Sequence, residues 1–270
     1  MASYEWVDKG GVPKTFSVVL LCLSAIVLVG LQQKAPGWIL WALGTLTLFF
    51  AERRFAKHLV LVSLGLAILG LTPITTDLSS SHFVVMGLTL IAALSVPYLV
   101  SRFVYKEDLI KVSLYRKRGW NRGELAYFGV ATAIFYFLIP FYLQSTGAYL
   151  NWSKPVTSND ILRLFMGTNA LGLWDELFFI CTAFLVLRKV MPFIWANLVQ
   201  SIMFTSFLYE LGFTGWGPLF LFPFAFFQGF MFKKTESLGY VIALHLTLDF
   251  LLFLALVHAH NPSMASVFVF

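Results

Sequence analysis

Apolar residues occur along this chain in long blocks, and most charged residues lie in the short stretches between them. A helix needs about 20 residues to cross a hydrocarbon core of about 30 Å, and somewhat fewer where the bilayer thins. The pattern predicts an all-α, polytopic membrane helix bundle with about nine transmembrane helices, or eight, because the second and third blocks are short. The predicted spans are residues 16–32, 37–51, 58–73, 83–101, 125–145, 161–187, 191–212, 216–232 and 239–258.

The composition supports this class of protein. Hydrophobic residues make up 59% of the 270 residues, charged residues only 12%, and the mean hydropathy is +0.81. A soluble domain could not keep so much apolar surface out of water. Cys22 and Cys181 both lie inside apolar blocks, so we interpret them as small buried residues rather than as a disulfide or part of a zinc cluster.

The basic residues predict an orientation, because Lys and Arg of short loops accumulate on the cytoplasmic side. When successive loops are assigned to alternate sides with the N-terminus inside, only Lys34, Lys154 and Arg163 of the 19 basic residues fall outside. We therefore predict an integral protein of the cell (plasma) membrane with a cytoplasmic N-terminus. Loops that face anionic lipid explain the net charge of +6, so membrane lipid is an expected partner and nucleic acid is not.

Three regions follow from this topology. Residues 1–102 hold the N-terminal transmembrane helices, whose role the sequence does not indicate. Residues 103–124 combine apolar residues with many Lys and Arg residues, which predicts a basic cytoplasmic loop lying at the membrane interface. Residues 125–270 form the predicted C-terminal bundle, and the charges inside the membrane belong to this part.

Four ionisable residues lie well inside predicted spans, away from the span ends. Asp175 and Glu176 are adjacent in the middle of the sixth span, and His245 and Asp249 share one face of the ninth span at a spacing of four residues. A carboxylate at a helix centre costs roughly 2.5–3.5 kcal/mol. The carboxylates could be a structural pair that fixes helix packing, but intramembrane ionisable groups indicate a functional site by default.

This combination of side chains favours the activation of water. Paired carboxylates in a low-dielectric cavity do not ionise independently, so one is expected to hold a proton while the other acts as a base or a metal ligand. A histidine with a second polar group could polarise a carbonyl and stabilise the resulting oxyanion. The reaction class that we predict is hydrolysis of an amide inside the membrane.

Two motifs in the C-terminal half support this chemistry. The run from Asp175 and Glu176 to Ile180 is similar to Glu-Glu-x-x-x-Arg, and His245 to Asp249 matches His-x-x-x-Asn or Asp. On these motifs, residues 125–258 resemble the CAAX protease and bacteriocin-processing (CPBP, or Abi) family of intramembrane proteases, which includes the type II CAAX prenyl endopeptidases. The resemblance implies a membrane-embedded peptide hydrolase of the metalloprotease type that acts on a membrane-embedded or lipidated peptide.

The resemblance also implies roles for the four residues. Asp175 would be the base that activates water, Glu176 would assist it, and His245 with Asp249 would stabilise the oxyanion. No cofactor is certain from the sequence, but a divalent metal such as zinc is a candidate.

The chain departs from the family pattern at two motif positions. Ile180 stands where the family has arginine, and Leu208 stands where a Phe-x-x-x-His motif places a water- or metal-binding histidine. Glu210 is a further candidate for the site, because it could replace the missing ligand if the helix shifts. Two alternatives to a protease therefore remain: a degenerate CPBP-like protein that binds a membrane partner or peptide, and a transporter or proton-coupled channel.

Overall fold

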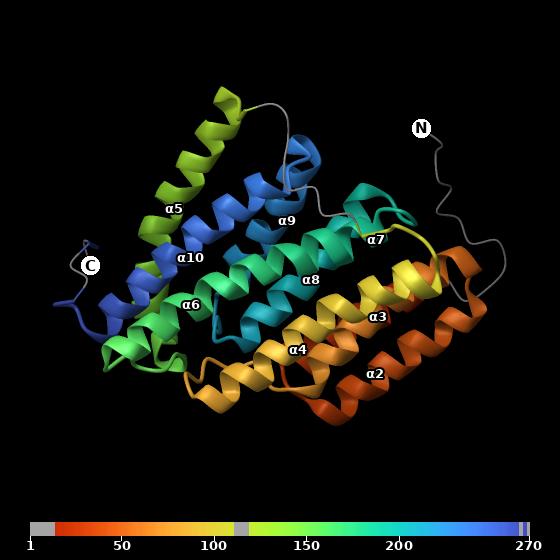
Figure 1. Cartoon of the computed structure of the whole chain (residues 1–270), viewed down its shortest axis with the longest axis horizontal. Helices are drawn as coiled ribbons and strands as arrows, with labels where there is room; N and C mark the ends of the chain where they lie inside the picture. The colour runs from red at the N-terminus through yellow and green to blue at the C-terminus, as the bar shows by residue number, and fades with distance from the viewer. Residues whose placement is uncertain (1–13, 111–118, 265–266, 269–270) are drawn as a thin grey trace.

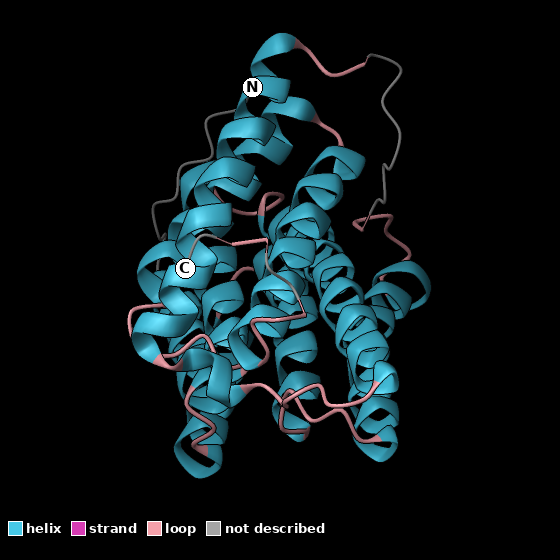
Figure 2. Cartoon of the chain, turned by 90° about the vertical axis from the view of Figure 1, so that its left-hand side faces the viewer, coloured by secondary structure: helices cyan, strands magenta, loops and turns pink. Residues whose placement is uncertain are grey.

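The computed structural model describes residues 14–110, 119–264 and 267–268, and these residues form helices and loops without a strand (Figure 2). The all-α prediction is confirmed. The helical elements in chain order are α1 (Lys14–Ser24), η1 (Ala25–Gly30), α2 (Lys34–Thr47), η2 (Leu48–Phe50), α3 (Arg53–Leu71), α4 (Ser80–Leu99), η3 (Val100–Val104), α5 (Arg122–Thr146), η4 (Ala148–Asn151), α6 (Ser158–Asp175), η5 (Glu176–Phe184), α7 (Leu185–Leu187), α8 (Phe193–Glu210), α9 (Pro218–Thr235) and α10 (Leu238–His260).

Each predicted span overlaps a helical stretch. Within the described residues, five stretches are long and apolar enough to cross a bilayer: α3, α4 with η3, α5, α6 through α7, and α10. The third block is not short as predicted, because α3 begins at Arg53 and runs for 19 residues. The fold is thus that of a membrane helix bundle, and nine as the number of spans stays a prediction.

Local signals in the sequence explain where two of the long helices begin and end. Asn121 and Glu124 form a reciprocal capping box at the start of α5, and Thr157 and Asp160 form another at the start of α6. Each box pairs two backbone N–H groups that would otherwise lack a partner. Gly147 ends α5 with a φ of 69°, a left-handed conformation that glycine adopts without steric cost.

The helices pack into one bundle with a shared core. Helix α10 packs against α5 and α6, α8 packs against α9, α1 packs against α2, and α3 packs against α4 (Figure 1). The N-terminal helices also contact the C-terminal part, since η1 packs on α8 and α4 packs on η5. The boundary between an N-terminal part and a C-terminal core therefore stays a prediction.

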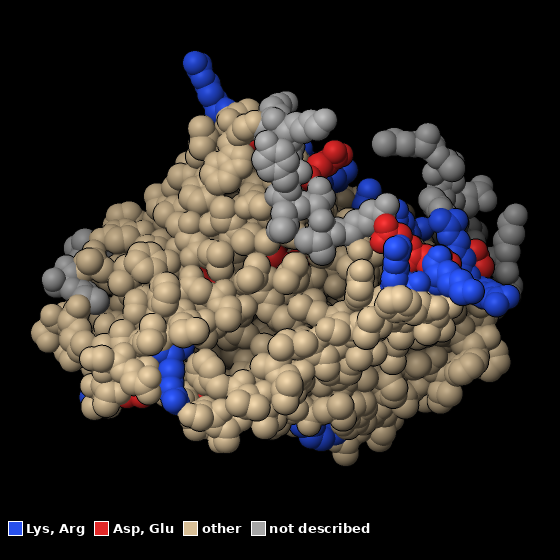
Figure 3. Space-filling view, in the orientation of Figure 1, with Lys and Arg blue, Asp and Glu red and all other residues tan. Residues whose placement is uncertain are grey.

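Most of the face shown in Figure 3 carries neither acidic nor basic side chains, and the Lys and Arg side chains gather mainly at its right end. Large apolar side chains such as Phe49, Leu88 and Phe141 are more than half exposed, as expected for surfaces that face lipid. Ion pairs join helix ends, with Lys14 bound to Glu52 at 2.9 Å. The predicted interfacial loop at 103–124 is described only in part, because residues 111–118 lie outside the described residues.

One irregularity in the helices bears on function. The helix that starts at Ser158 changes from α to π geometry at Glu176 and keeps it to Phe184. A π-helical stretch is rare and often marks a functional site. The π geometry begins at Glu176, directly after Asp175, and the carboxyl groups of both residues lie close to His245 of α10.

Candidate active site

The structure brings together the four ionisable residues that the sequence places inside the membrane. Asp175 ends α6, Glu176 begins η5, and His245 and Asp249 lie one turn apart on α10. All four are buried, and α6 and η5 both pack against α10. A cluster of three carboxyl groups around one imidazole therefore lies inside the bundle.

Glu176 holds the imidazole of His245. Its Oε1 lies 2.8 Å from His245 Nδ1. An ionised carboxylate can only accept, so Nδ1–H is the donor when Glu176 is charged. This contact fixes the plane of the ring and leaves the other ring nitrogen, Nε2, to face the rest of the cluster.

Asp175 and Asp249 flank the second ring nitrogen. His245 Nε2 lies 3.8 Å from Asp175 Oδ2 and 3.8 Å from Asp249 Oδ1. Both distances exceed those of a direct hydrogen bond. One oxygen of each carboxyl group, Asp175 Oδ1 and Asp249 Oδ2, is buried without a protein hydrogen-bond partner in the described structure. Buried polar atoms without a partner are costly, so these two oxygens are suited to a water, a proton or a polar group of a substrate.

A fifth polar residue, which the sequence analysis missed, belongs to the cluster. Gln228 on α9 is buried, and its Nε2 donates to Glu176 Oε1 at 2.9 Å and to the backbone oxygen of Val241 at 3.3 Å. The signal was present in the sequence, because Gln228 is an amide within the aromatic-rich run from Leu219 to Phe232.

Gly172 allows α6 and α10 to approach closely at this point. A Cβ at residue 172 would overlap the Oδ2 atom of Asp249 and would come within 3.3 Å of the His245 ring. Any side chain here would therefore displace Asp249. The glycine lies one turn before Asp175, so the small residue and the carboxyl groups form one site.

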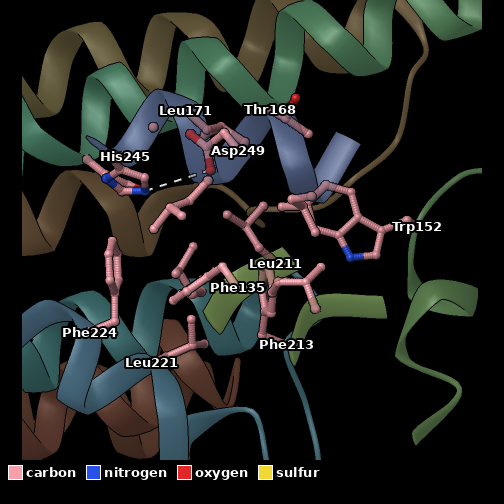
Figure 4. A pocket seen from close by; sticks show the side chains of 16 residues that line it. Phe135, Trp152, Thr168, Leu171, Leu211, Phe213, Leu221, Phe224, His245 and Asp249 are labelled. Carbon is pink, nitrogen blue, oxygen red and sulfur yellow. Dashed lines mark ion pairs between the residues drawn. The ribbon is translucent and has the colours of Figure 1, made fainter. Parts of the chain in front are cut away.

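A cavity of about 40 Å³ adjoins the cluster (Figure 4). Asp175, His245 and Asp249 line it on one side, and apolar side chains such as Phe224 and Leu248 line the rest. A water needs about 10–15 Å³ measured in this way, so the cavity has room for about three waters. It is too small for a peptide, and a substrate could enter only if neighbouring side chains moved.

Leucine and isoleucine occupy the two family positions as the sequence indicates. Leu208 lines the cavity together with Asp175, His245 and Asp249, so an apolar group stands where the family pattern has a ligand. Ile180 is buried in η5 and offers Glu176 no charge. The hydrogen bonds from His245 and Gln228 take the place of the ion pair that arginine would supply.

The donor set does not fit a bound metal. Among the described residues, no group of three or more His, Cys, Asp and Glu side chains is arranged to hold a metal ion. Glu176 occupies one nitrogen of His245, and Leu208 supplies no ligand. We therefore derive no step of the reaction through a metal.

Glu210 does not join the cluster, contrary to the expectation that it could replace the missing ligand. It ends α8, and its Oε1 accepts a hydrogen bond of 2.5 Å from the backbone N–H of Ile74, between α3 and α4. Leu208 lines the cavity, but Glu210 does not. On a regular helix, residues two positions apart in sequence lie about 200° apart around the axis, which explains why Leu208 and Glu210 cannot both face the cavity.

Buried carboxyl and imidazole groups thus lie beside a water-sized cavity inside an all-α membrane bundle. Residues 157–251, about a third of the chain, match the family model of the Rce1-like type II CAAX prenyl endopeptidases. This match is consistent with the CPBP family, and it includes Asp175, Glu176, His245 and Asp249. No curated protein and no solved structure matches the chain.

Proposed function

We propose that this protein is a membrane endopeptidase of the CPBP type that hydrolyses a peptide bond in a membrane-embedded or lipidated peptide. The observation that carries the proposal is the convergence of Asp175, Glu176, His245 and Asp249 beside a cavity large enough for water. The family match supports a membrane endopeptidase. Placement in the plasma membrane with a cytoplasmic N-terminus is part of the proposal, supported by the distribution of Lys and Arg.

In the proposed reaction, Asp175 takes a proton from a water in the cavity, and the water oxygen attacks the carbonyl carbon of the substrate. His245 in its doubly protonated form donates from Nε2 to the developing oxyanion, while Glu176 and Gln228 hold the ring in place. The C–N bond then breaks, and the proton on Asp175 passes to the leaving amine. Asp249, whose Oδ1 lies 3.8 Å from the same Nε2, balances the charge on the imidazolium.

The test uses the protein reconstituted in liposomes with candidate lipidated peptides and measures cleavage by mass spectrometry. Glu176→Ala should abolish cleavage, because the Nδ1–H group of His245 then has no acceptor that holds the ring in place. Asp108→Asn changes a half-exposed carboxylate far along the chain from the cluster and should leave cleavage unchanged. Equal cleavage by the wild type and by Glu176→Ala would overturn the assigned mechanism.

A second function is favoured by one observation. Leu208 replaces a polar ligand at the wall of the cavity, as expected if hydrolysis has been lost and the protein only binds a membrane partner or peptide. This alternative would be selected if the wild type and Glu176→Ala bound a lipidated peptide equally and neither protein cleaved it. A transporter or channel has less support, because the four ionisable groups gather in one cluster instead of forming a path across the bundle.

A further inference from the structure

Two basic side chains from different turns converge on one aromatic ring at the end of the bundle predicted to face the cytoplasm. The ring is that of Phe193, the first residue of α8. The guanidinium carbon of Arg188, in the turn between α7 and α8, lies 5.4 Å from the ring centre, and Nζ of Lys233, in the last turn of α9, lies 4.2 Å from it. Both are distances of a cation–π contact. The two positive charges are therefore no farther apart than the sum of these distances.

No acidic side chain balances these two charges within the described structure. Neither Arg188 nor Lys233 forms an ion pair with a carboxylate there, and Glu236, three residues after Lys233, is exposed and forms none either. Like charges repel over such a separation, because the screening length at physiological ionic strength is about 8 Å. An anion bound to both side chains would relieve this repulsion.

The two cations are suited to a phosphate group. The planar guanidinium of arginine binds two phosphate oxygens side by side, and the ammonium group of lysine acts as a point charge with three donors. Arg188 is half-buried and Lys233 is exposed, so a phosphate could reach both from the surface. The positive end of the α8 helix dipole lies at the same place, since Phe193 begins this helix, and it adds to the attraction for an anion.

An exposed apolar surface continues from these charges towards the middle of the predicted spans. Phe230 and Phe227 lie about one and two turns before Lys233 on α9, and they are 44% and 51% exposed. The Phe230 ring also contacts the Phe193 ring, with 6.3 Å between the ring centres. At 1.5 Å per residue, Phe227 lies about 9 Å along the helix from Lys233. A ligand with a phosphate at the charges and a hydrocarbon chain along the phenylalanines fits this surface.

The charges also select among phospholipids. The headgroup of a zwitterionic lipid would bring a third cation beside Arg188 and Lys233, whereas a headgroup with a net negative charge brings none. General attraction of basic loops to an anionic membrane acts over a screening length and needs no fixed arrangement of side chains. Here the arrangement is fixed by one ring that both cations contact, which indicates a defined site.

From these contacts we propose that one anionic phospholipid binds at the outer surface of α8 and α9, with its phosphate between Arg188 and Lys233 and an acyl chain along Phe230 and Phe227. We call this place the α8–α9 lipid site. None of its residues lines the cavity beside Asp175. The site is therefore separate from the ionisable cluster, and it does not depend on the proposed hydrolysis.

The same two turns provide a matched control for a test. Lys189 and Lys234 are the sequence neighbours of Arg188 and Lys233, are exposed, and make no cation–π contact in the described part of the chain. Arg188→Gln combined with Lys233→Gln removes the converging charges. Lys189→Gln combined with Lys234→Gln removes the same net charge from the same turns. None of the four side chains is fully buried, so both double variants should unfold at the temperature of the wild type.

The probe is dioleoyl phosphatidylglycerol, titrated into the purified full-length protein in detergent, and native mass spectrometry counts the bound lipid. The wild type should bind one molecule and should prefer it at least about tenfold over dioleoyl phosphatidylcholine. The first double variant should lose at least about tenfold in affinity, and the second at most about twofold, because exposed charges without a fixed partner contribute little. Equal losses in both double variants, or equal binding of the two lipids, would overturn the proposal.

Further arms separate a phospholipid from a free phosphate. Glycerophosphoglycerol, the same headgroup without chains, should bind far more weakly, and equal affinity would overturn the assignment to a lipid. Phe230→Ser should weaken the binding of phosphatidylglycerol, whereas Phe49→Ser, at an 82% exposed position in η2, should not. Lys233→Gln alone should already weaken binding, so the test holds even where the double variant is unstable. Unchanged affinity of a well-folded Lys233→Gln protein would contradict the site.

Discussion

Glu176 Oε1 accepts the Nδ1 hydrogen of His245 at 2.8 Å, and the same oxygen accepts a hydrogen bond from Gln228 Nε2 at 2.9 Å. Glu176 therefore holds the histidine through Oε1. Its Oε2, like Asp175 Oδ1 and Asp249 Oδ2, is buried without a protein partner in the described structure, but only Asp175 and Asp249 line the cavity. This geometry gives the carboxyl groups different roles, and it favours Asp175 over Glu176 as the group that contacts water.

Replacing Gln228 should lower turnover. Gln228→Met keeps the size of the side chain but removes the donor to Glu176, and a hydrogen bond to a charged group contributes about 1.5–3 kcal/mol. If that energy orients His245 in the transition state, kcat should fall roughly 10- to 100-fold with little change in KM. Steady-state cleavage of a lipidated peptide measures both constants.

The control for this prediction is Gln200→Met. Gln200 is a buried amide on α8 that donates to the Ala225 oxygen at 2.9 Å and does not contact Glu176. It should lose stability to a similar extent without a selective loss of kcat. Parallel losses of kcat in both variants would mean that Gln228 has only a structural role.

Adding one methyl group at residue 172 should inactivate the site. In Gly172→Ala the new Cβ would overlap Asp249 Oδ2, so the carboxyl group must move away from His245. Alanine elsewhere in a helix is more favourable than glycine by about 1 kcal/mol, and Gly129→Ala, which meets open space, should be neutral or stabilising. The measurements are the cleavage rates and thermal unfolding temperatures of both variants. Full activity of Gly172→Ala would contradict the close approach of α6 and α10.

Much of the fold could be predicted from the sequence, because a bilayer requires long apolar segments with their backbone groups paired within a helix. The same reasoning located Asp175, Glu176, His245 and Asp249, since charges inside spans are conspicuous. It could not find Gln228, because an uncharged amide in an aromatic run gives a weak signal. Nor could it place Glu210, because the packing of the Ile74 segment against the end of α8 depends on contacts between helices far apart in sequence.

Changing Glu210 should affect stability and spare the chemistry. Glu210→Leu removes the acceptor of the Ile74 N–H, and a buried donor left without a partner costs about 1–3 kcal/mol. The unfolding temperature should therefore fall. The specific activity of the folded fraction should match that of the wild type, because Glu210 does not line the cavity at the cluster. A complete loss of cleavage in well-folded protein would return Glu210 to the site.

The end of the bundle that carries the most charge should contribute a small, pH-dependent stability. The Lys57 side chain donates a hydrogen bond to Glu107, which lowers the pKa of this carboxyl group below its usual value of about 4.5. A lowered pKa in the folded state means that the contribution is present above the unfolded pKa and is lost as the pH falls through the folded pKa. The contribution should be at most about 1 kcal/mol, because both side chains are partly exposed.

The measurement is the thermal unfolding of the wild type and of Glu107→Gln between pH 2 and pH 8. The wild type should be the more stable protein near pH 7, the difference should vanish at the acid end, and high salt should reduce it because surface pairs are screened. A difference that grows as the pH falls would contradict the assigned ion pair.

A histidine at position 208, where the Phe-x-x-x-His motif has one, should turn the cluster into a metal-binding site. Leu208 lines the cavity with Asp175, His245 and Asp249, so Leu208→His would add an imidazole nitrogen to two carboxylates and a histidine. Such a donor set suits Zn²⁺. After exposure to zinc and gel filtration, Leu208→His should retain about one Zn²⁺ per chain by elemental analysis, and Phe207→His should retain none because residue 207 does not line the cavity.

Cleavage by the wild type should survive a chelator, whereas any cleavage that Leu208→His gains with zinc should not. Chelator-sensitive cleavage by the wild type would show that the cluster recruits a metal even with leucine at this position, and the metal-free reaction would then be wrong.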